Sequence, residues 1–419
     1  MRKEKGEDMT QSRYKWLALA ILWVAFFLQQ GTRQIFGATL SSIQATLQTS
    51  AAAIGAVATV FTFAYGLSVP FAGAAADLFS RKWMVVGGVF IFCLGIFASG
   101  FVASLGLLIV VYGLLNGIGQ SFYYPSATSI IGSLHKETRA TAFSILQMGL
   151  YAGIIGVSAA SGYFAEMGDN GWRTPFMVFG GAGVLWALLM AFLLKESAAE
   201  NVDAAKGETK ASFREAFKVF AGNPSALLLA GGLGMMIYVD VGFKTWMPSH
   251  LTAAFEVSKS SAAINAVLWH YIGAFIGVTL GGRFSDRLSK SRPSIRMETN
   301  IIGLALAVPF IIWMANASSL LMCAIAMALF GVFRGIYDSN LMASLFDLIP
   351  QRYHASGAGL MLSCAFVFGS TSPVVLGLIK DQFSSTIALS SLAAFYLFGA
   401  ILIFIAKVRT FHSNLKLTT

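Results

Sequence analysis

Five charged side chains fall within stretches of the sequence that are otherwise apolar. Three are basic, Arg33, Lys244 and Arg334, and two are acidic, Asp240 and Asp338. A charge within the hydrocarbon of a bilayer costs about 2.5–3.5 kcal/mol on insertion scales, so such residues face a polar cavity and mark a pathway. The cations exceed the anions by one, and a negatively charged solute is the simplest partner for the unmatched charge.

Arg33 lies in the outer half of the first apolar stretch and has the chemistry best suited to an anion. A guanidinium can hold a carboxylate or a phosphate through two parallel hydrogen bonds. Gln29, Gln30 and Thr32 precede it and make this part of the stretch polar. The pattern favours a cavity wall on which Arg33 and Gln30 bind substrate. The alternative is an arginine that reaches toward lipid headgroups.

Lys244 occupies nearly the equivalent place in the second half of the chain. The string GFK (242–244) matches GTR (31–33) after a one-residue gap, so two basic side chains could approach one central anion from opposite sides. Asp240 lies four residues before Lys244 on the same helical face. An ion pair between these two residues is therefore the competing interpretation.

Arg334 and Asp338 are also four residues apart and form a second candidate pair. Either they neutralise one another permanently, or Asp338 exchanges a proton as the cavity opens and closes and so couples solute movement to a proton gradient. Asp240 is the rival proton carrier. His270 is a further candidate because histidine titrates near neutral pH, although a histidine within a span is more often a hydrogen-bonded core residue.

Other polar and aromatic residues could line the same cavity. Hydroxyl groups of a substrate would bind to side chains of the predicted fourth, eighth and tenth spans: Gln120, Tyr123, Tyr124, His270, Tyr337 and Asn340. Aromatic residues at this density could equally pack the protein or lie at the membrane interface. The sequence has no enzyme motif, nucleotide loop or metal-ligand cluster, so we expect neither catalysis nor a metal or cofactor.

The composition requires a membrane around these residues. The chain of 419 residues is 56% hydrophobic and 11% charged, whereas a soluble domain carries about 25% charged residues. We predict an all-α polytopic membrane protein in the lipid bilayer. Its twelve predicted spans are 16–40, 51–75, 83–101, 105–131, 141–164, 173–194, 225–248, 261–282, 297–315, 319–346, 356–378 and 386–407.

The basic residues predict the orientation. All but six of the 29 lysines and arginines fall in segments on the side of the two termini. Cytoplasmic segments carry such an excess, so we expect both termini in the cytoplasm and the protein in a cell membrane, the inner membrane of a bacterium. The net charge of +10 is not gathered into a nucleic-acid-binding motif, so we expect no nucleic-acid partner.

The chain divides into two similar halves. We predict a tail (1–15), a six-helix bundle (16–195), an inter-bundle loop with an interfacial helix (196–223), a second six-helix bundle (224–408) and a C-terminal tail (409–419). Three collinear matches relate the halves: QTSAAAIGAV with SKSSAAINAV, GLLNGIGQS with GVFRGIYDS, and GAAAD with GRFSD. Parallel repeats of this kind place a central site between the bundles.

These strings carry a family resemblance. GAAADLFSRK (73–82) resembles the signature of the major facilitator superfamily between the second and third spans, and GGRFSDRLSK (281–290) resembles its second copy. The resemblance implies two pseudo-symmetric six-helix bundles, alternating access and a monomer. It also implies a cytoplasmic gate, because a carboxylate and cations at helix ends can form inter-helix ion pairs that break on opening. The residues at the matching positions are Gly73, Asp77, Arg81, Asp286 and Arg287.

Within the superfamily the chain resembles the organic-anion branch, which includes anion:cation symporters and transporters of sugar acids and sialic acids. The resemblance rests on Arg33, FTFAYGLSVPFAG (61–73), KTWMP (244–248) and GWRTPF (171–176). One departure is Gly113, where many symporters of this branch have a fourth-span arginine. Arg334 is the nearest basic analogue, so the coupling role of that arginine is not assigned to the fourth span.

The resemblance implies uptake of a small organic anion with protons, the anion being a carboxylate such as a sugar acid or a monocarboxylate. Coupling to sodium stays open. The alternatives are an exchanger of organophosphates against phosphate, a lipid or drug exporter of the same fold, and a sensor that does not transport.

Overall fold

The structure is a computed structural model that describes residues 2–135, 137–196, 213–289, 292, 294–350 and 353–414. Every regular element among these residues is a helix. The helices of the first half are α1 (Arg2–Leu47), α2 (Ala51–Leu78), α3 (Arg81–Ser99), α4 (Leu105–Leu108), η1 (Ile109–Asn116), α5 (Gly117–Ser121), α6 (Tyr123–Leu134), α7 (Arg139–Ala165) and α8 (Arg173–Leu193).

The second half begins after a short helix, α10 (Phe213–Ala221), which lies in the predicted inter-bundle loop; residues 197–212 of that loop fall outside the described residues. Phe220 on α10 is buried, whereas Phe217 is half exposed. The helices that follow are α11 (Pro224–Phe255), α12 (Lys259–Ser289), α13 (Ile295–Ala315), α14 (Leu320–Phe346), α15 (His354–Gly369), α16 (Ser372–Gln382) and α17 (Ser385–Asn414).

The predicted all-α polytopic architecture is confirmed. Eleven segments of the described residues are long and apolar enough to cross a bilayer. The remaining predicted span lies in α1, where Gln29, Gln30 and Arg33 interrupt the apolar stretch and lower its mean hydropathy. Polar side chains in such a helix must face the protein interior or a water-filled cavity.

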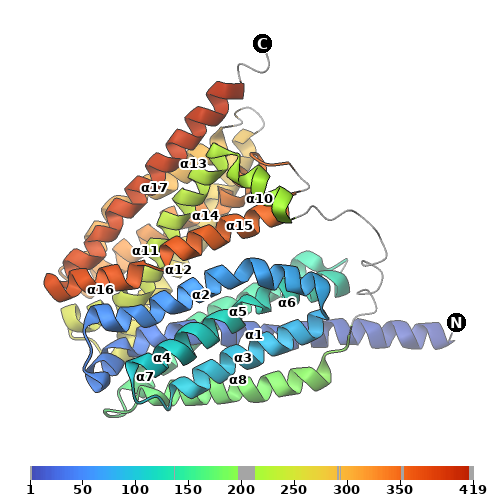
Figure 1. Ribbon diagram of the computed structural model, residues 1–419, viewed down its shortest axis with the longest axis horizontal. Coiled ribbons are helices and arrows are strands. Elements are labelled where there is room, and N and C mark those ends of the chain that lie inside the picture. The colour runs from blue at the N-terminus through green and yellow to red at the C-terminus, as the bar shows by residue number, and fades with distance from the viewer. Residues whose placement is uncertain are drawn as a thin grey trace.

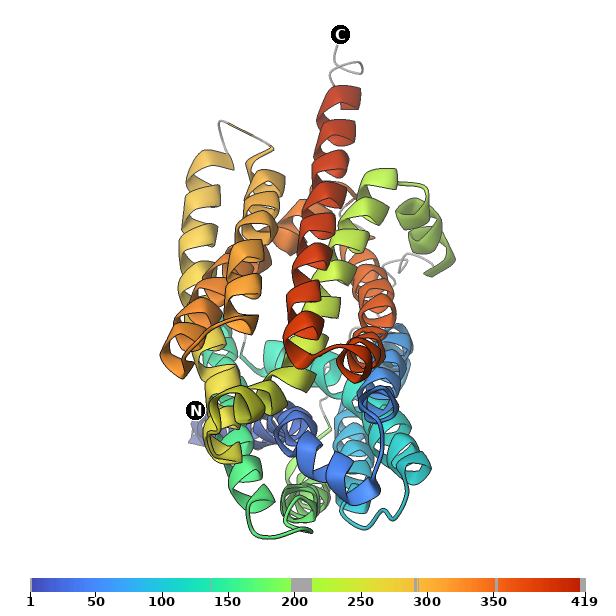
Figure 2. The ribbon, with the colours of Figure 1, turned by 90° about the vertical axis from the view of Figure 1, so that its left-hand side faces the viewer.

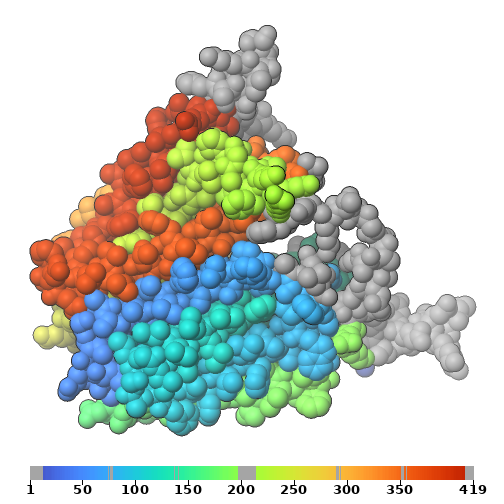
Figure 3. All heavy atoms as spheres, in the orientation of Figure 1, coloured from blue at the N-terminus to red at the C-terminus, as the bar shows by residue number. Residues whose placement is uncertain are grey.

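The helices form two bodies that meet at one end and diverge at the other. Figure 1 shows α1–α8 below and α11–α17 above, and the two bodies are furthest apart on the side of the N- and C-termini. The contacts between them are made by α2 with α15 and α16, by α7 with α12, and by α1 with α11. Figure 3 shows α15 and α16 lying directly on α2, and Figure 2 shows the end where the bodies meet.

Glycines allow the two bodies to approach closely at that end. A Cβ added to Gly162 of α7 would lie 2.5 Å from the Cα of Ser260 in α12, and one added to Gly55 of α2 would lie 2.5 Å from the carbonyl oxygen of Pro373 in α16. Small residues at such crossings let helix backbones touch in a membrane. The contact is therefore a backbone-to-backbone seal rather than a layer of large side chains.

Two carboxylates reinforce this seal in a reciprocal way. Asp381, in the last turn of α16, accepts hydrogen bonds from the backbone N–H groups of Ala51 (2.9 Å) and Ala52 (2.8 Å) at the start of α2. Glu166, after α7, accepts one from the N–H of Ser260 (3.1 Å) at the start of α12. Each bundle thus places an acid on the N-terminus of a helix of the other bundle, where a negative charge is stabilised by the helix dipole.

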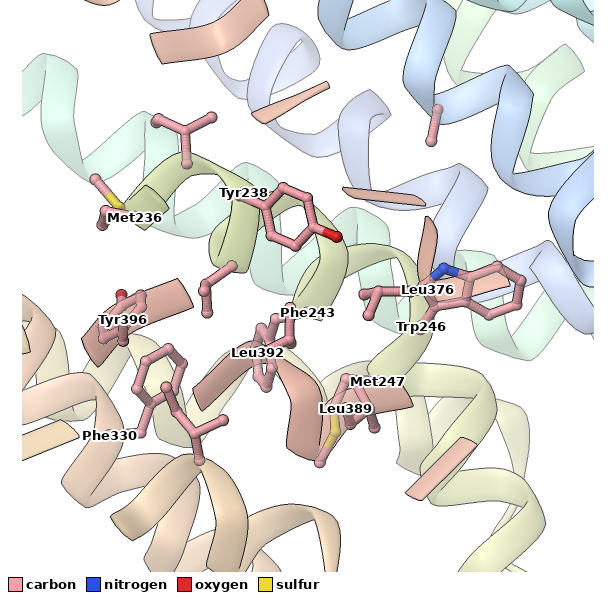
Figure 4. Packing of buried hydrophobic residues seen from close by; sticks show 14 of the residues in the cluster. Met236, Tyr238, Phe243, Trp246, Met247, Phe330, Leu376, Leu389, Leu392 and Tyr396 are labelled. Atoms are coloured by element: carbon pink, nitrogen blue, oxygen red, sulfur yellow. The ribbon is translucent and has the colours of Figure 1, made fainter. Parts of the chain in front are cut away.

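A dense core holds α11 in place within the second bundle. Figure 4 shows side chains of α11, among them Tyr238, Phe243 and Trp246, packed among Phe330 and residues of α16 and α17. The Tyr238 and Phe395 rings stack with their centroids 3.8 Å apart. The indole N–H of Trp246 donates to the carbonyl oxygen of Pro373 (3.1 Å). This packing fixes the helix that carries Asp240 and Lys244.

Candidate functional site

A cavity of about 90 Å³ lies between the two bundles and is open to solvent. Its walls come from α1, α2, η1, α11 and α15, so both halves of the chain contribute. The lining residues are Gln30, Arg33, Gln34, Phe36, Gly37, Ala58, Phe61, Thr62, Tyr65, Tyr112, Asp240, Val241, Lys244, Thr245 and Phe366.

Arg33 lines this cavity and forms no ion pair with any acid of the described residues. Its Nε donates a hydrogen bond to the side-chain oxygen of Gln120, and its guanidinium lies over the Tyr65 ring, 4.5 Å from the centroid. Its Nη2 is buried without a hydrogen-bond partner. Among the described residues no carboxylate forms an ion pair with Arg33, so its charge is balanced only by neutral groups.

The fourth span supplies the group that orients Arg33. Gln120 lies in α5, directly after the π-helix η1, and its Nε2 donates to the side-chain oxygen of Asn116 (2.9 Å). Gln29 of α1 donates to the Gln120 backbone carbonyl (2.7 Å). Because the Gln120 amide uses its nitrogen on Asn116, its oxygen is left to accept from Arg33. π-helical segments often occur at functional sites for this kind of side-chain placement.

The second half of the site is a chain of alternating charges. Asp240 binds Lys244 (2.8 Å) through one carboxylate oxygen and Arg334 through the other. Arg334 also lies 3.4 Å from Asp338. These two cations and two anions balance one another, so the unmatched positive charge of the membrane region is that of Arg33.

His270 completes this network as a neutral acceptor. Its Nε2 lies 2.7 Å from Nη1 of Arg334. An arginine only donates hydrogen bonds, so Nε2 must carry the lone pair and the proton resides on Nδ1. The His270 ring is buried between Phe243 and Phe330, with centroids 5.2 and 4.8 Å away.

The structure brings together five of the predicted substrate and coupling residues around the cavity or its charge network. They are Arg33, Lys244, Asp240, Arg334 and Asp338. Gln30 lines the cavity, whereas Gln120 and His270 are buried behind Arg33 and Arg334 and contact those arginines. Tyr124 is half exposed and packs against Phe26, with ring centroids 5.9 Å apart.

Six of the predicted substrate-binding residues do not line the cavity: Gln120, His270 and Tyr124, described above, and three more that are buried elsewhere. Tyr123 is fully buried and donates its hydroxyl to the carbonyl oxygen of Leu22 (2.5 Å). Tyr337 is fully buried in the core of the second bundle. Asn340 is buried and donates to Ser339 (2.8 Å) on its own helix. In this conformation all three are packing residues.

The aromatic walls of the cavity were missed from the sequence. Phe61 and Tyr65 of α2, Tyr112 of η1 and Phe366 of α15 all line it. Tyr271 of α12 lies beneath Lys244, with the ammonium 5.5 Å from the ring centroid. The available signal was the string FTFAYGLSVPFAG, which contains the first two of these residues.

The predicted gate residues lie toward the end at which the bundles diverge. Gly73 lies in α2, and a Cβ added to it would meet no atom within 4 Å. Arg81 begins α3, while Asp286 and Arg287 are exposed near the end of α12. The side chain of Asp77 lies outside the described part of the structure. Their part in a gate stays a prediction.

A family profile covers most of the chain. The profile described as Major Facilitator Superfamily matches residues 22–373 and 244–416. The probable sulfoacetate transporter of Cupriavidus necator is 25% identical over 386 residues, which are 88% of each chain. The probable galactarate/D-glucarate transporter of Escherichia coli is 24% identical over 411 residues, 89% of this chain and 88% of the relative. Protein spinster homolog 1 of Xenopus laevis is 24% identical over 411 residues, 91% of this chain and 77% of the relative.

A solved structure has the same fold. The crystal structure of a bacterial homologue of the human lysosomal transporter Spinster, inward-facing and unoccupied, superimposes with a TM-score of 0.82. The match covers 96% of this chain and 98% of that chain at 21% sequence identity.

Proposed function

This chain belongs to the Major Facilitator Superfamily of membrane transporters, and we propose that it takes up a small organic carboxylate together with protons. It is a transporter and not an enzyme, in keeping with its family and fold. The carboxylate class draws support from the named substrates of two relatives, sulfoacetate and galactarate or D-glucarate. The binding role is argued from the site itself.

The observation that carries the proposal is the unpaired charge of Arg33. Its Nη2 is buried without a partner on the wall of the cavity, and no acid among the described residues neutralises it. A buried charge without a partner costs several kcal/mol relative to a paired one. A bound carboxylate would supply the missing pair, and Lys244 on the opposite wall would contribute further donors.

Substrate binding would favour closure because an anion can contact both bundles at once. Arg33 belongs to the first bundle, and Lys244, which is paired with Asp240, belongs to the second; all three line the cavity. An anion between them draws the bundles together around the site. The reciprocal contacts of Asp381 and Glu166 at the opposite end would then break, which opens the cavity to the other side of the membrane.

Asp338 is the better placed of the two candidate proton carriers. The Asp240 side chain is 11% exposed and is held by two cations, whereas the Asp338 side chain is 32% exposed and lies 3.4 Å from Arg334 alone. A proton could reach Asp338 without breaking a buried triad. Each proton that moves across 100 mV contributes about 2.3 kcal/mol, which is enough to concentrate a substrate about 50-fold.

Export of an amphiphile is the second candidate function. It is favoured by the aromatic walls of the cavity and by the similarity to spinster proteins. A lipid exporter would load its substrate from the bilayer.

Reconstitution into proteoliposomes tests these functions directly. Uptake of a panel of radiolabelled carboxylates is measured with and without an imposed inward proton gradient, and a labelled lysophospholipid serves as the comparison. The proposal predicts accumulation of a carboxylate only with the gradient. Transport of the lysophospholipid alone would contradict it in favour of the second function.

A further inference from the structure

We propose that the substrate is an aromatic monocarboxylate, a single negative charge on a flat apolar body, rather than a polyhydroxylated or dianionic acid. The inference rests on the proposed function and concerns the same cavity. It follows from three independent features: the charge balance, the use of the hydroxyl groups on the wall, and the arrangement of the rings.

The charge balance admits one negative charge. Arg33 is the one cation of the membrane region without an acidic partner among the described residues. Lys244 is committed to Asp240 at 2.8 Å. A second carboxylate on the substrate would have to take Lys244 from Asp240, or remain buried without a counter-charge. Either event is unfavourable, because the first breaks the ion pair of Lys244 with Asp240 and the second leaves a charge without a partner.

The polar groups of the wall do not suit a polyol. The hydroxyl of Thr62 donates to the carbonyl oxygen of Ala58 (2.8 Å), and that of Thr245 donates to the carbonyl oxygen of Val241 (2.8 Å). The hydroxyl proton of each threonine is therefore already used in a hydrogen bond within its own helix. The side-chain amides of Gln30 and Gln34 and the hydroxyls of Tyr65 and Tyr112 remain. Those hydroxyls of a sugar acid that exceed these few groups would lack partners, which disfavours their binding.

The rings form two aromatic clusters on the cavity wall. In one, the Tyr65 ring of α2 meets the Phe366 ring of α15 edge to face, with centroids 5.0 Å apart. In the other, Tyr112 packs against Phe36 at 5.1 Å and Phe61 at 5.5 Å. All five residues line the cavity. A flat ring can stack or pack edge-on against such surfaces, in the geometries that aromatic pairs prefer.

The Arg33 guanidinium lies beside these rings, where it can bind the carboxylate of such a substrate. The Arg33 guanidinium is 4.5 Å from the Tyr65 centroid and 5.8 Å from that of Phe61. An arylcarboxylate can therefore place its carboxylate on Arg33 and its ring among the aromatic residues at the same time. Since Tyr65 and Phe366 come from different bundles, the ring of the substrate would bridge the two halves.

Titration calorimetry of the purified full-length protein tests the inference. The ligands are benzoate, acetate, gluconate and terephthalate, which separate the ring, the charge and the hydroxyl groups. We expect benzoate to bind about 10-fold or more tightly than each of the others, since one aromatic contact and one unpaired charge are each worth about 1.4 kcal/mol or more.

Three variants make the test specific. Phe366→Leu should weaken benzoate binding several-fold and leave acetate binding unchanged. Tyr65→Leu also removes the ring beneath Arg33, so it should weaken the binding of both ligands and that of benzoate more. Phe333→Leu is the matched control, because Phe333 stacks on Phe310 in the second bundle and does not line the cavity. It should bind benzoate as the parent protein does.

The outcomes separate this inference from the proposed function. If gluconate or terephthalate binds more tightly than benzoate and Arg33→Gln abolishes that binding, the anion site stands and the aromatic specificity is wrong. Unchanged benzoate affinity in both ring variants would also overturn the specificity. If none of the four ligands binds, the inference and the proposed carboxylate transport both fail.

Discussion

Replacement of Gln120 by glutamate is the sharpest perturbation that the site offers. Gln120→Glu keeps the size and shape of the side chain, and the new carboxylate can accept the same hydrogen bond from Nε of Arg33. It gives Arg33 the acidic partner that it lacks. If the unmatched charge of Arg33 attracts the substrate, this single exchange of an amide for a carboxylate should remove the attraction without removing the arginine.

The size of the effect follows from the geometry. The Gln120 oxygen is bound at Nε, and the free Nη2 lies on the same edge of the guanidinium, so a carboxylate at position 120 can bind both nitrogens. A substrate anion would then be left with the opposite edge, about 6 Å away, where at an effective dielectric constant near 20 the repulsion is about 3 kcal/mol. That corresponds to about a 100-fold rise in Kd. Gln120→Leu removes the acceptor without adding charge and should cost about 1–2 kcal/mol, or about 10-fold.

The assay is titration calorimetry with benzoate, accompanied by size-exclusion chromatography to show that each variant remains monodisperse. Gln44→Glu is the matched control, since Gln44 lies near the C-terminal end of α1, away from the cavity, and donates to the backbone carbonyl oxygen of Thr49 (3.1 Å). The expected order of affinity is parent and Gln44→Glu, then Gln120→Leu, then Gln120→Glu. If Gln120→Glu binds as tightly as Gln120→Leu, charge balance at Arg33 does not control binding.

Three further predictions address coupling, stability and the seal between the bundles. Asp338→Asn should abolish gradient-driven accumulation in proteoliposomes and retain counterflow; persistent accumulation would exclude Asp338 as the proton carrier. Arg334→Ala leaves Asp338 unpaired and Asp240 with Lys244 alone, so it should destabilise the protein by about 3–5 kcal/mol and lower its melting temperature in detergent; an unchanged melting temperature would refute the network's structural role. Asp381→Asn removes the negative charge at the start of α2, which weakens this contact by about 1 kcal/mol. The population of molecules whose bundles are separated at that end should therefore rise several-fold. Unchanged spin-label distances between the start of α2 and the end of α16 would contradict this.

The sequence predicted the helices and the central charges because both stand out against an apolar background. The twelve apolar stretches correspond to the long helical segments of the structure, although α1 fails a strict hydropathy criterion because of its own site residues. A charged residue inside such a stretch has few structural explanations. Arg33, Asp240 and Lys244 could therefore be found without any knowledge of the fold.

The partners of these charges could not be predicted in the same way. The spacing showed the pairs Asp240–Lys244 and Arg334–Asp338, each four residues apart on one helix. It gave no sign that Arg334 reaches across from α14 to Asp240 on α11, because that contact depends on how two helices pack. The consequence is large: Asp240 becomes the buried centre of the network, and Asp338 becomes its more accessible end.

The fourth span shows why helical periodicity misplaced other residues. An ordinary α-helix would put Gln120, Tyr123 and Tyr124 on one face. The structure instead has the π-helix η1 before Gln120 and a break in the helix at Phe122. As a result the Tyr123 side chain points into the core of the first bundle. The aromatic walls were missed for a different reason, since aromatic residues make up 13% of the chain and a useful ring cannot be told from a packing ring by spacing.

The central claim is that Arg33 holds the substrate anion, and equilibrium binding to Arg33 variants tests it most directly. The ligand is the panel carboxylate with the highest affinity for the parent protein, measured by calorimetry against monodisperse Arg33→Gln and Arg33→Lys. The account predicts no measurable binding to Arg33→Gln and partial recovery with Arg33→Lys, which restores the charge but not the two parallel hydrogen bonds. Parent-like affinity in Arg33→Gln would contradict it.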